Sequence, residues 1–295
     1  MNLNIQKNIL LSPYTSYGTG GSARFFIIPE TEQDISESIK WADSKNIRFF
    51  VLGEGTNVLV SDKGYDGLII KISRTISAIQ NKDFYVISKA GTLLEDLVNH
   101  VNKCGFSGME KLAGIPGSVG GAVAMNAGAF GQEIKDNLKL VKYIDNKGDV
   151  RTSVVEDMAM GYRTSLIRQK GGIIFEAEFS FDHNKTKSPQ ELKLESLEII
   201  KKRVEKQPLE FKSCGSVFKR PPGSYAGALI EECGLKGFRI GGAGVSQKHA
   251  NFIINIGDAT SLDIYRVIQH VKEAVFKKRG VNLECEVVFL GDFCE

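Results

Sequence analysis

The residues that point most clearly to a function in this chain are glycines, because their backbone could bind a ligand. The run from Gly114 to Gly131 holds six glycines among its eighteen residues and contains no Lys, Arg, Asp or Glu. Glycine tolerates positive φ and lets a backbone approach another surface closely. An anion bound to this run would therefore be held by backbone N–H groups, in a nest or at the start of a helix. The alternative is a tightly packed turn without a ligand, and the run alone favours neither interpretation.

A second glycine-rich turn, Gly53-Glu-Gly-Thr-Asn57, follows the β-like run from Arg48 to Leu52. Two backbone cradles in adjacent segments suit one long ligand that carries a diphosphate, such as a dinucleotide. The Gly-x-Gly-x-x-Ala pattern from Gly18 to Ala23 is a weaker signal, because no apolar strand precedes it. The run Phe25–Ile28 after it also has the pattern of a strand and not of a helix.

Several other chemistries lack the residues that they need. The chain has no Gly-Lys dipeptide for a Walker A loop, no Gly-x-Ser-x-Gly elbow and no His-Glu-x-x-His motif. Its net charge of +3 is too small to indicate binding to nucleic acid or to a membrane surface, and no apolar run is long enough to span a membrane. The odd number and wide spacing of the five cysteines predict reduced thiols and no metal site. The four histidines are also scattered along the chain, so we predict none of them to be a metal ligand.

The strands and helices predicted around the two glycine-rich turns alternate along the chain. Hydrophobic periodicity predicts a β-α-β-β segment, whose helix starts at Thr31 and places Ile35, Ile39 and Ala42 on one face. Further strands are expected at 84–89, 138–145, 150–155, 173–181, 213–219, 251–256 and 282–290, and further helices at 93–104, 191–206, 225–233 and 261–279. The alternation of apolar and polar residues over 173–181 is typical of a half-buried strand. Such interleaving is typical of an α/β or α+β protein.

The polar, turn-rich segment 182–190 is the expected main domain boundary. A charged helix over 191–206 then leads into the last domain. We predict one subdomain at 1–75, a second at 76–187 and a C-terminal domain at 188–295.

The two glycine-rich turns belong to a series of short blocks that lie in order between Tyr17 and Gly291. The blocks are Gly53-Glu-Gly-Thr-Asn-Val-Leu59, Gly114-Ile-Pro-Gly-Ser-Val-Gly-Gly121, Met125-Asn-Ala-Gly-Ala-Phe-Gly131, Gly161-Tyr-Arg-Thr-Ser165, Ser213-Cys-Gly-Ser-Val-Phe-Lys-Arg-Pro221, Ile230-Glu-Glu-Cys-Gly-Leu-Lys-Gly-Phe-Arg-Ile-Gly241, Lys248-His-Ala-Asn-Phe-Ile253 and Leu283-Glu-Cys-Glu-Val287. Together they resemble the UDP-N-acetylenolpyruvoylglucosamine reductase family, in its shorter subtype.

The resemblance implies an α+β fold with a two-part FAD-binding region of the vanillyl-alcohol-oxidase-like type. A C-terminal α/β substrate-binding domain follows it. The implied cofactors are FAD and NADPH. By their places in the matching blocks, the residues expected to hold FAD are Gly53, Glu54, Gly55, Thr56, Asn57, Val58, Gly114, Ile115, Pro116, Gly117, Ser118, Gly121, Ala122, Asn126, Ala127 and Gly128.

The family's reaction belongs to peptidoglycan precursor synthesis. NADPH reduces FAD, and a hydride then passes from reduced FAD to C3 of the enolpyruvyl group of UDP-N-acetylglucosamine enolpyruvate. A proton delivered to C2 gives UDP-N-acetylmuramate. Negative charge builds up on C2 and its carboxylate, and a guanidinium suits that charge because it is always protonated and binds two oxygens.

By resemblance, Arg163 stabilises this charge, Ser216 donates the proton and Glu286 helps to share charge or a proton. The implied substrate contacts are Tyr162, Arg163, Lys219 and Arg220.

Two neighbouring residues compete with these assignments. Ser213 lies three positions before Ser216, and side chains three apart on a strand point to opposite faces, so only one serine could face the flavin. Glu284 would share a strand face with Glu286.

Two departures from the family pattern affect substrate contacts. The family usually has Asn at the position of Arg220, which contacts the nucleotide part, and a longer polar residue at the position of Gly244. Both leave the hydride chemistry untouched.

Two alternative functions remain open. One is another FAD-dependent oxidase or dehydrogenase of the same fold, and the other is a non-catalytic module that binds flavin or a nucleotide sugar. The joint presence of Arg163, Ser216 and Glu286 favours the reductase. We expect a cytoplasmic monomer whose partner is a small nucleotide sugar.

Overall fold

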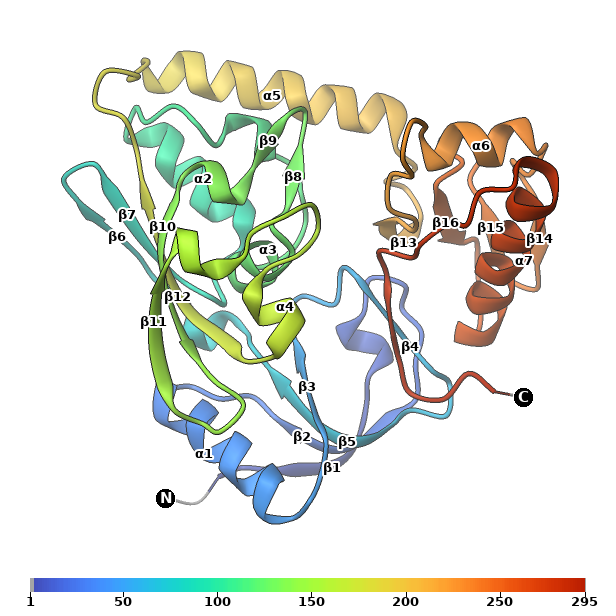
Figure 1. Ribbon diagram of the computed structural model, residues 1–295, viewed down its shortest axis with the longest axis horizontal. Coiled ribbons are helices and arrows are strands. Elements are labelled where there is room, and N and C mark those ends of the chain that lie inside the picture. Colours follow the sequence, from blue (N-terminus) through green and yellow to red (C-terminus); the bar gives the residue numbers. More distant parts are fainter. Residues whose placement is uncertain (1–2, 295) are drawn as a thin grey trace. The chain divides into compact units, whose positions relative to one another are not determined.

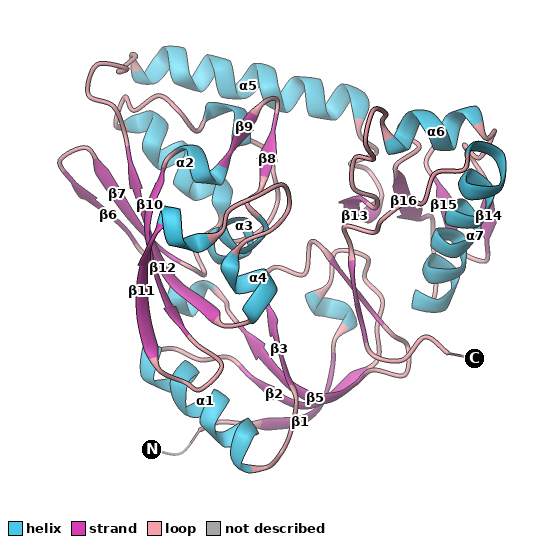
Figure 2. Cartoon of the chain, viewed as in Figure 1, coloured by secondary structure: helices cyan, strands magenta, loops and turns pink. Residues whose placement is uncertain are grey.

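A computed structural model describes residues 3–294 of the chain (Figure 1). Helices and strands are mixed along it (Figure 2). Contacts between residues divide it into two compact units. Unit 1 consists of the stretch up to Gln6, Phe26–Glu54 and Gly67–Arg203, and unit 2 consists of Lys7–Phe25, Gly55–Asp66 and the chain from Val204 onward. The division at 75 and 187 that the sequence predicts stays a prediction.

Unit 1 contains a five-stranded antiparallel sheet in the order β11-β10-β12-β7-β6. Its strands are β6 (Ile79–Lys82), β7 (Tyr85–Lys89), β10 (Leu138–Ile144), β11 (Val150–Val154) and β12 (Ile173–Ser180). Apolar side chains of β12 are buried in near alternation with half-buried polar ones, which confirms the predicted half-buried strand. The helices α2 (Leu94–Lys103) and α3 (Val119–Met125) pack against each other, and α3 also packs on β7 and β12.

The predicted helix after Thr31 is confirmed as α1 (Glu32–Ser44). Thr31 accepts a hydrogen bond from the backbone of Asp34, and the Asp34 carboxylate accepts one from the Thr31 backbone, which completes a capping box. A four-stranded sheet has the order β1 (Gln6–Leu10), β2 (Ser22–Ile27), β5 (Tyr65–Lys71) and β3 (Phe49–Leu52). Strands β3 and β5 are parallel.

Unit 2 is built on the sheet β13-β16-β15-β14. These strands are β13 (Lys212–Ser216), β14 (Arg239–Ile240), β15 (Ala243–Val245) and β16 (Phe252–Asn255). The helices α6 (Ala226–Glu232) and α7 (Ser261–Arg279) match the predicted ranges closely. One apolar core joins the buried faces of these elements and also includes Tyr17, Leu59 and Cys214. A parallel pair, β4 (Val58–Val60) and β17 (Val288–Leu290), completes the unit.

Several short elements were not predicted. The glycine-rich run contains α3 and the two-residue strand β8 (Gly128–Ala129), and β9 (Gln132–Glu133) follows it directly. Strand β6 was also missed. The predicted strand over 282–290 is wrong for most of its length, because only β17 has strand geometry there, apart from a single bridge at Cys285. The helix α4 (Leu166–Lys170) was missed, and α5 (Pro189–Lys206) confirms the helix predicted over 191–206.

The argument that Ser213 and Ser216 face opposite sides is wrong. Ser213 is opposite Ile254 and Ser216 is opposite Phe252, so three steps along β13 match two along β16. Gly215, with φ of +72°, lies in this β-bulge. Because the bulge adds one residue to β13, strict alternation of faces does not apply to these two serines.

The core of unit 2 predicts a pH-dependent stability. Burial raises the pKa of the Cys214 thiol to about 12, whereas a thiol in an unfolded chain ionises near about 8.5. Folding therefore keeps the thiol neutral, and this stabilisation is complete below the unfolded pKa and is lost as pH rises toward the folded one. Between pH 8 and 10, we expect the free energy of unfolding to fall by about 1–2 kcal/mol more in the parent than in Cys214→Ala. Denaturant unfolding at both pH values measures this, and equal losses would contradict it.

Candidate active site

The two glycine-rich turns meet within unit 1. A Cβ atom added to Gly53 would lie 2.9 Å from the Oγ atom of Ser118. Ser118 is the N-cap of α3, and its Oγ accepts a hydrogen bond of 3.3 Å from the backbone N–H of Gly121. The start of this helix thus lies directly against the first turn, as expected if both turns hold one ligand.

The glycines of the second turn differ in what surrounds them. A Cβ at Gly120 would lie 2.9 Å from the Cβ of Ala90, and one at Gly114 would lie 3.0 Å from Cδ of Arg203. Those two glycines are explained by packing inside the protein. Gly121, in contrast, is exposed, and an added Cβ would meet only the Ser118 Oγ, at 3.5 Å. The interpretation as a packed turn therefore accounts for part of the run, and the first turn of α3 is left open to a ligand.

An ion pair involves the second residue of the first glycine-rich turn. The Nζ atom of Lys71 lies 2.9 Å from Oε1 of Glu54, and the lysine side chain is only 8% exposed. The same Nζ also donates to the carbonyl of Ile72. A buried ammonium needs such partners, so Glu54 has a structural function in addition to its predicted contact with FAD.

The rest of that turn belongs to unit 2. Gly55 has φ of +65°, and a Cβ there would lie 2.0 Å from the carbonyl oxygen of Tyr14, so only glycine fits. The carbonyl of Val58 lies 3.4 Å from Sγ of Cys214. The Nδ2 of Asn57 donates a hydrogen bond of 3.1 Å to the backbone carbonyl of Glu286. This half of the turn is therefore fixed to the segments that carry Ser216 and Glu286.

The structure brings Ser216 and Glu286 to neighbouring positions in unit 2. Phe218 and Cys285 form an antiparallel bridge. The backbone N–H of Glu286 donates a bond of 2.7 Å to the carbonyl of Val217, the residue after Ser216. Both Ser216 and Glu286 are half-buried.

Asn251 is a buried residue of this region that the sequence did not single out. Its Oδ1 accepts a bond from the Phe218 N–H, and its Nδ2 donates to the Phe218 carbonyl, at 3.0 and 2.9 Å. It thus fixes the segment after Ser216. The block Lys248-His-Ala-Asn-Phe-Ile253 was the available signal, but no local pattern points from it to Phe218.

The predicted substrate residues of unit 2, Lys219 and Arg220, lie three and four positions after Ser216. Lys219 forms an ion pair with Glu284, which neutralises the charge of the lysine. The Glu284 side chain is largely exposed. The guanidinium of Arg220 lies 4.2 Å from the ring centroid of Tyr225. Two positive charges therefore lie within four residues of the predicted proton donor.

Arg163 belongs to unit 1 and has an unusual backbone. Its φ is +56°, in a region of backbone conformation that residues other than glycine rarely adopt. Its Nη2 donates a bond of 3.1 Å to the carbonyl of Gly128, and its guanidinium lies 5.1 Å from the ring centroid of Tyr162. Unit 1 thus holds Gly53, Glu54, the 114–128 run, Tyr162 and Arg163, while unit 2 holds Gly55–Val58, Ser216, Lys219, Arg220 and Glu286.

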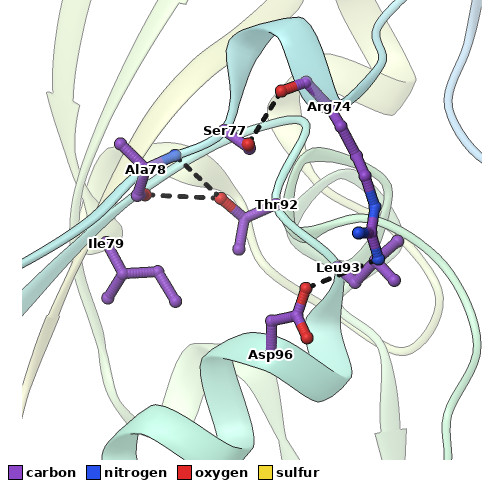
Figure 3. A pocket seen from close by; sticks show the side chains of 7 residues that line it. All are labelled: Arg74, Ser77, Ala78, Ile79, Thr92, Leu93 and Asp96. Carbon is purple, nitrogen blue, oxygen red and sulfur yellow. Dashed lines mark hydrogen bonds and ion pairs between the residues drawn. The ribbon is translucent and has the colours of Figure 1, made fainter.

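A small pocket of about 190 Å³ lies elsewhere in unit 1 (Figure 3). An ion pair of 3.6 Å joins Arg74 to Asp96 at its wall, and Thr92 bonds to the backbone of Ala78. None of the predicted site residues lines it.

Across residues 3–294, no group of three His, Cys, Asp or Glu side chains could hold a metal ion. In the same range, no helix is both long and apolar enough to cross a membrane.

Comparison with known proteins assigns the chain. A model for an FAD binding domain matches residues 23–153, and one for the C-terminal domain of UDP-N-acetylenolpyruvoylglucosamine reductase matches residues 207–290. The reductase of Alkaliphilus oremlandii is 40% identical over 95% of this chain and 91% of the relative. The chain belongs to the UDP-N-acetylenolpyruvoylglucosamine reductase family.

Two further relatives agree with this assignment. The reductase of Clostridium botulinum strain Alaska E43 is 41% identical over 98% of this chain and 93% of its own length. The crystal structure of the reductase from Thermus caldophilus superposes with a TM-score of 0.83 at 34% identity, covering 98% of this chain and all of that one. The predicted fold class, an FAD-binding region followed by a C-terminal domain, is confirmed.

The residues present fit FAD. The model for the FAD binding domain spans both glycine-rich turns. The first turn of α3 is exposed at Gly121, and the first glycine-rich turn lies against it. The backbone N–H groups of Val119 and Gly120 already bond to carbonyls of Thr92 and Ala90, and that of Gly121 bonds to the Ser118 Oγ. This turn therefore offers a ligand an uncharged glycine surface that it can approach closely. Members of this family are FAD-containing oxidoreductases, and this chain has the features that FAD needs.

The variant Gly121→Ala distinguishes between two interpretations of this turn, one in which it binds FAD and one in which it is only packed against the protein. In a helix, alanine is favoured over glycine by up to about 1 kcal/mol, and the new Cβ meets nothing closer than 3.5 Å. We expect the FAD-free protein to become slightly more stable, while FAD dissociates on the order of tenfold more readily, a loss of about 1.4 kcal/mol. Flavin titration and thermal unfolding measure the two effects.

The matched control for this variant is Gly227→Ala, in the first turn of α6, where an added Cβ would have ordinary contacts of 3.4 Å or more. It should leave the affinity for FAD unchanged. Unchanged affinity in Gly121→Ala as well would show that this turn of α3 does not contact the cofactor.

Proposed function

We propose that this protein reduces the enolpyruvyl group of UDP-N-acetylglucosamine enolpyruvate to UDP-N-acetylmuramate with electrons from NADPH, in peptidoglycan precursor synthesis. Membership of the reductase family over nearly the whole chain supports this. The observation that carries the proposal is the pairing of the Ser216 and Glu286 segments beside Asn57 of the first glycine-rich turn. Bound FAD, once reduced, supplies the hydride. The residues expected to hold it are those of the two glycine-rich turns.

Arg163 stabilises the charge that develops on C2 and the carboxylate of the substrate. A guanidinium is suited to this because it stays protonated and presents parallel donors to two oxygens. A bond to Gly128 and the aromatic ring of Tyr162 hold it in place. Fixed charge of this kind acts most strongly where it need not reorganise during the reaction.

Ser216 donates the proton to C2. A serine hydroxyl is a weak acid, so it needs a strongly basic acceptor and a group that restores its proton. Glu286 lies on the segment paired with the one after Ser216, and it shares charge or a proton there. Half-burial of both side chains limits the access of water to them.

Lys219 and Arg220 bind the nucleotide part of the substrate. They lie three and four positions after Ser216, so a diphosphate held by them places the enolpyruvyl group near the serine. Arg220 stands where the family usually has Asn, and its guanidinium lies over the exposed ring of Tyr225. One chain supplies Arg163, Ser216 and Glu286, and NADPH and nucleotide sugars are cytoplasmic metabolites. We therefore also propose a cytoplasmic monomer.

Ser216→Ala tests the proposed chemistry. Loss of a general acid typically slows a proton transfer by about 10²–10⁴-fold. We expect reoxidation of the NADPH-reduced enzyme by the enolpyruvyl substrate to slow to this extent, while reduction by NADPH keeps its rate. Anaerobic stopped-flow absorbance at the flavin band measures both half-reactions.

Ser213→Ala is the matched control, because the bulge in β13 removes the argument from alternating faces. It should reoxidise at the parent rate. Normal reoxidation in Ser216→Ala together with slow reoxidation in Ser213→Ala would move the proton donor to Ser213. Failure of the parent enzyme to reoxidise with this substrate would overturn the proposed function.

A further inference from the structure

The turn that carries Arg163 is held in a strained shape. Gly161 and Thr164 exchange backbone hydrogen bonds of 3.1 and 3.2 Å, so Tyr162 and Arg163 occupy the two central positions of a tight turn. Turns with positive φ at the second central position normally have Gly or Asn there. An arginine in that conformation is strained. The surroundings must therefore hold the turn in this shape.

Two fully buried side chains bind this turn to the end of α3. The Nδ2 of Asn126 donates to the carbonyl of Gly161 at 2.9 Å, just before Tyr162. The Oγ of Ser165 donates to the carbonyl of Ala124 at 2.7 Å, just after Thr164. Both Asn126 and Ser165 are 0% exposed. The two bonds run in opposite directions between the same two segments and so clamp the turn at both ends.

Asn126 has a backbone and a set of partners that fix its amide. It caps α3 in the left-handed region, with φ of 43° and ψ of 56°. Its Nδ2 also donates to Oε2 of Glu133 at 3.0 Å, and its Oδ1 accepts from the N–H of Lys135 at 3.0 Å. The amide therefore has one orientation, and its bond to Gly161 has a fixed direction.

The same helix connects this clamp to the proposed cofactor cradle. Ser118 caps the start of α3 beside Gly53, and Asn126 caps its end. Seven helical residues span only about 10 Å, and a short helix packed on β7 and β12 is a stiff connection. The arginine turn and the helix start are thus held at a fixed separation.

We propose that Asn126 and Ser165 are positioning residues that hold the Arg163 turn at a fixed place relative to the start of α3. This inference rests on the proposed function, in which Arg163 neutralises the substrate carboxylate. The Asn126 side chain, which is fully buried and bonds to Gly161, Glu133 and Lys135, is thereby assigned to the placement of Arg163 in place of the contact with FAD that the sequence predicted. A displacement of about 1 Å at a reacting centre can lower a rate by about 10²-fold, so loss of the clamp is expected to act on catalysis through Arg163.

Asn126→Gly tests the clamp. Glycine adopts the same left-handed backbone without strain, so the variant removes the side-chain bonds and keeps the turn of the chain. Asn46→Gly is the matched control, because Asn46 also has positive φ, at 52°, but is exposed. We expect faster amide hydrogen exchange over 161–165 in Asn126→Gly and unchanged exchange there in Asn46→Gly. Unchanged exchange in both variants would overturn the clamp.

The effect on catalysis is measured in the two half-reactions of the FAD-loaded enzyme. In Asn126→Gly we expect reoxidation by the enolpyruvyl nucleotide sugar to slow by about 10–100-fold, with reduction by NADPH unchanged. Ser165→Ala should show the same pattern, and it serves as the second variant if Asn126→Gly does not fold. A parent-like rate of reoxidation in a folded clamp variant would overturn the inference.

A double-mutant cycle shows whether the effect passes through Arg163. In an Arg163→Lys background, Asn126→Gly should slow reoxidation less than twofold, because the group that it positions is already changed. A full effect in both backgrounds would mean that Asn126 acts through general structure, which contradicts the inference. If Arg163→Lys alone has no effect on reoxidation, the role of the arginine in the proposed function fails, whatever hydrogen exchange shows about the clamp.

Discussion

The close approach of two backbone turns is the constraint on which the proposed site depends. Gly53 lies so near Ser118 that a single added carbon would come within 2.9 Å of the serine oxygen. A glycine at position 53 leaves room for the Ser118 hydroxyl, which a larger residue there would displace. The Ser118 oxygen also accepts a hydrogen bond from the Gly121 N–H, so it orders the first turn of α3, which is exposed at Gly121. The buried pair of Lys71 and Glu54 then supports the loop.

Each unit carries a different part of the proposed chemistry. In unit 1, α3 runs from Ser118 to the clamp on the Arg163 turn. In unit 2, Asn57 bonds to the Glu286 backbone, and the Glu286 segment pairs with the one that follows Ser216. Charge stabilisation and proton donation are thus assigned to separate units. The chain passes from one unit to the other within the first glycine-rich turn, because unit 1 includes Glu54 and unit 2 includes Gly55.

Sequence patterns predicted the elements that have strong local signals. The capping residue Thr31 and the apolar stripes of α1, α2 and α7 are such signals, and these helices form where they were expected. Helix α3 was missed because three of its seven residues are glycine or methionine and the others are small or branched, so they show no amphipathic stripe. The bulge at Gly215 was missed because glycine inside a strand signals a bulge only weakly. The clamp by Asn126 joins residues 35 positions apart, and no local pattern encodes it.

The family blocks predicted site residues that local patterns could not, because the resemblance extends over nearly the whole chain. They named Ser216 and Glu286, which the structure places on paired segments. They did not predict that Glu284 would neutralise Lys219, or that Asn251 would hold Phe218. Such contacts depend on how distant segments pack, and the fold is needed to see them.

The central claim is that this chain carries electrons from NADPH to an enolpyruvyl nucleotide sugar through bound FAD. The most direct test is the visible absorption spectrum of the purified protein under anaerobic conditions. The absorption of oxidised flavin should bleach on addition of NADPH and return when UDP-N-acetylglucosamine enolpyruvate is added. Colour that bleaches but returns only with oxygen would contradict the claim and indicate a flavin oxidase, and a protein that binds no flavin even after incubation with FAD would contradict the assignment of both glycine-rich turns.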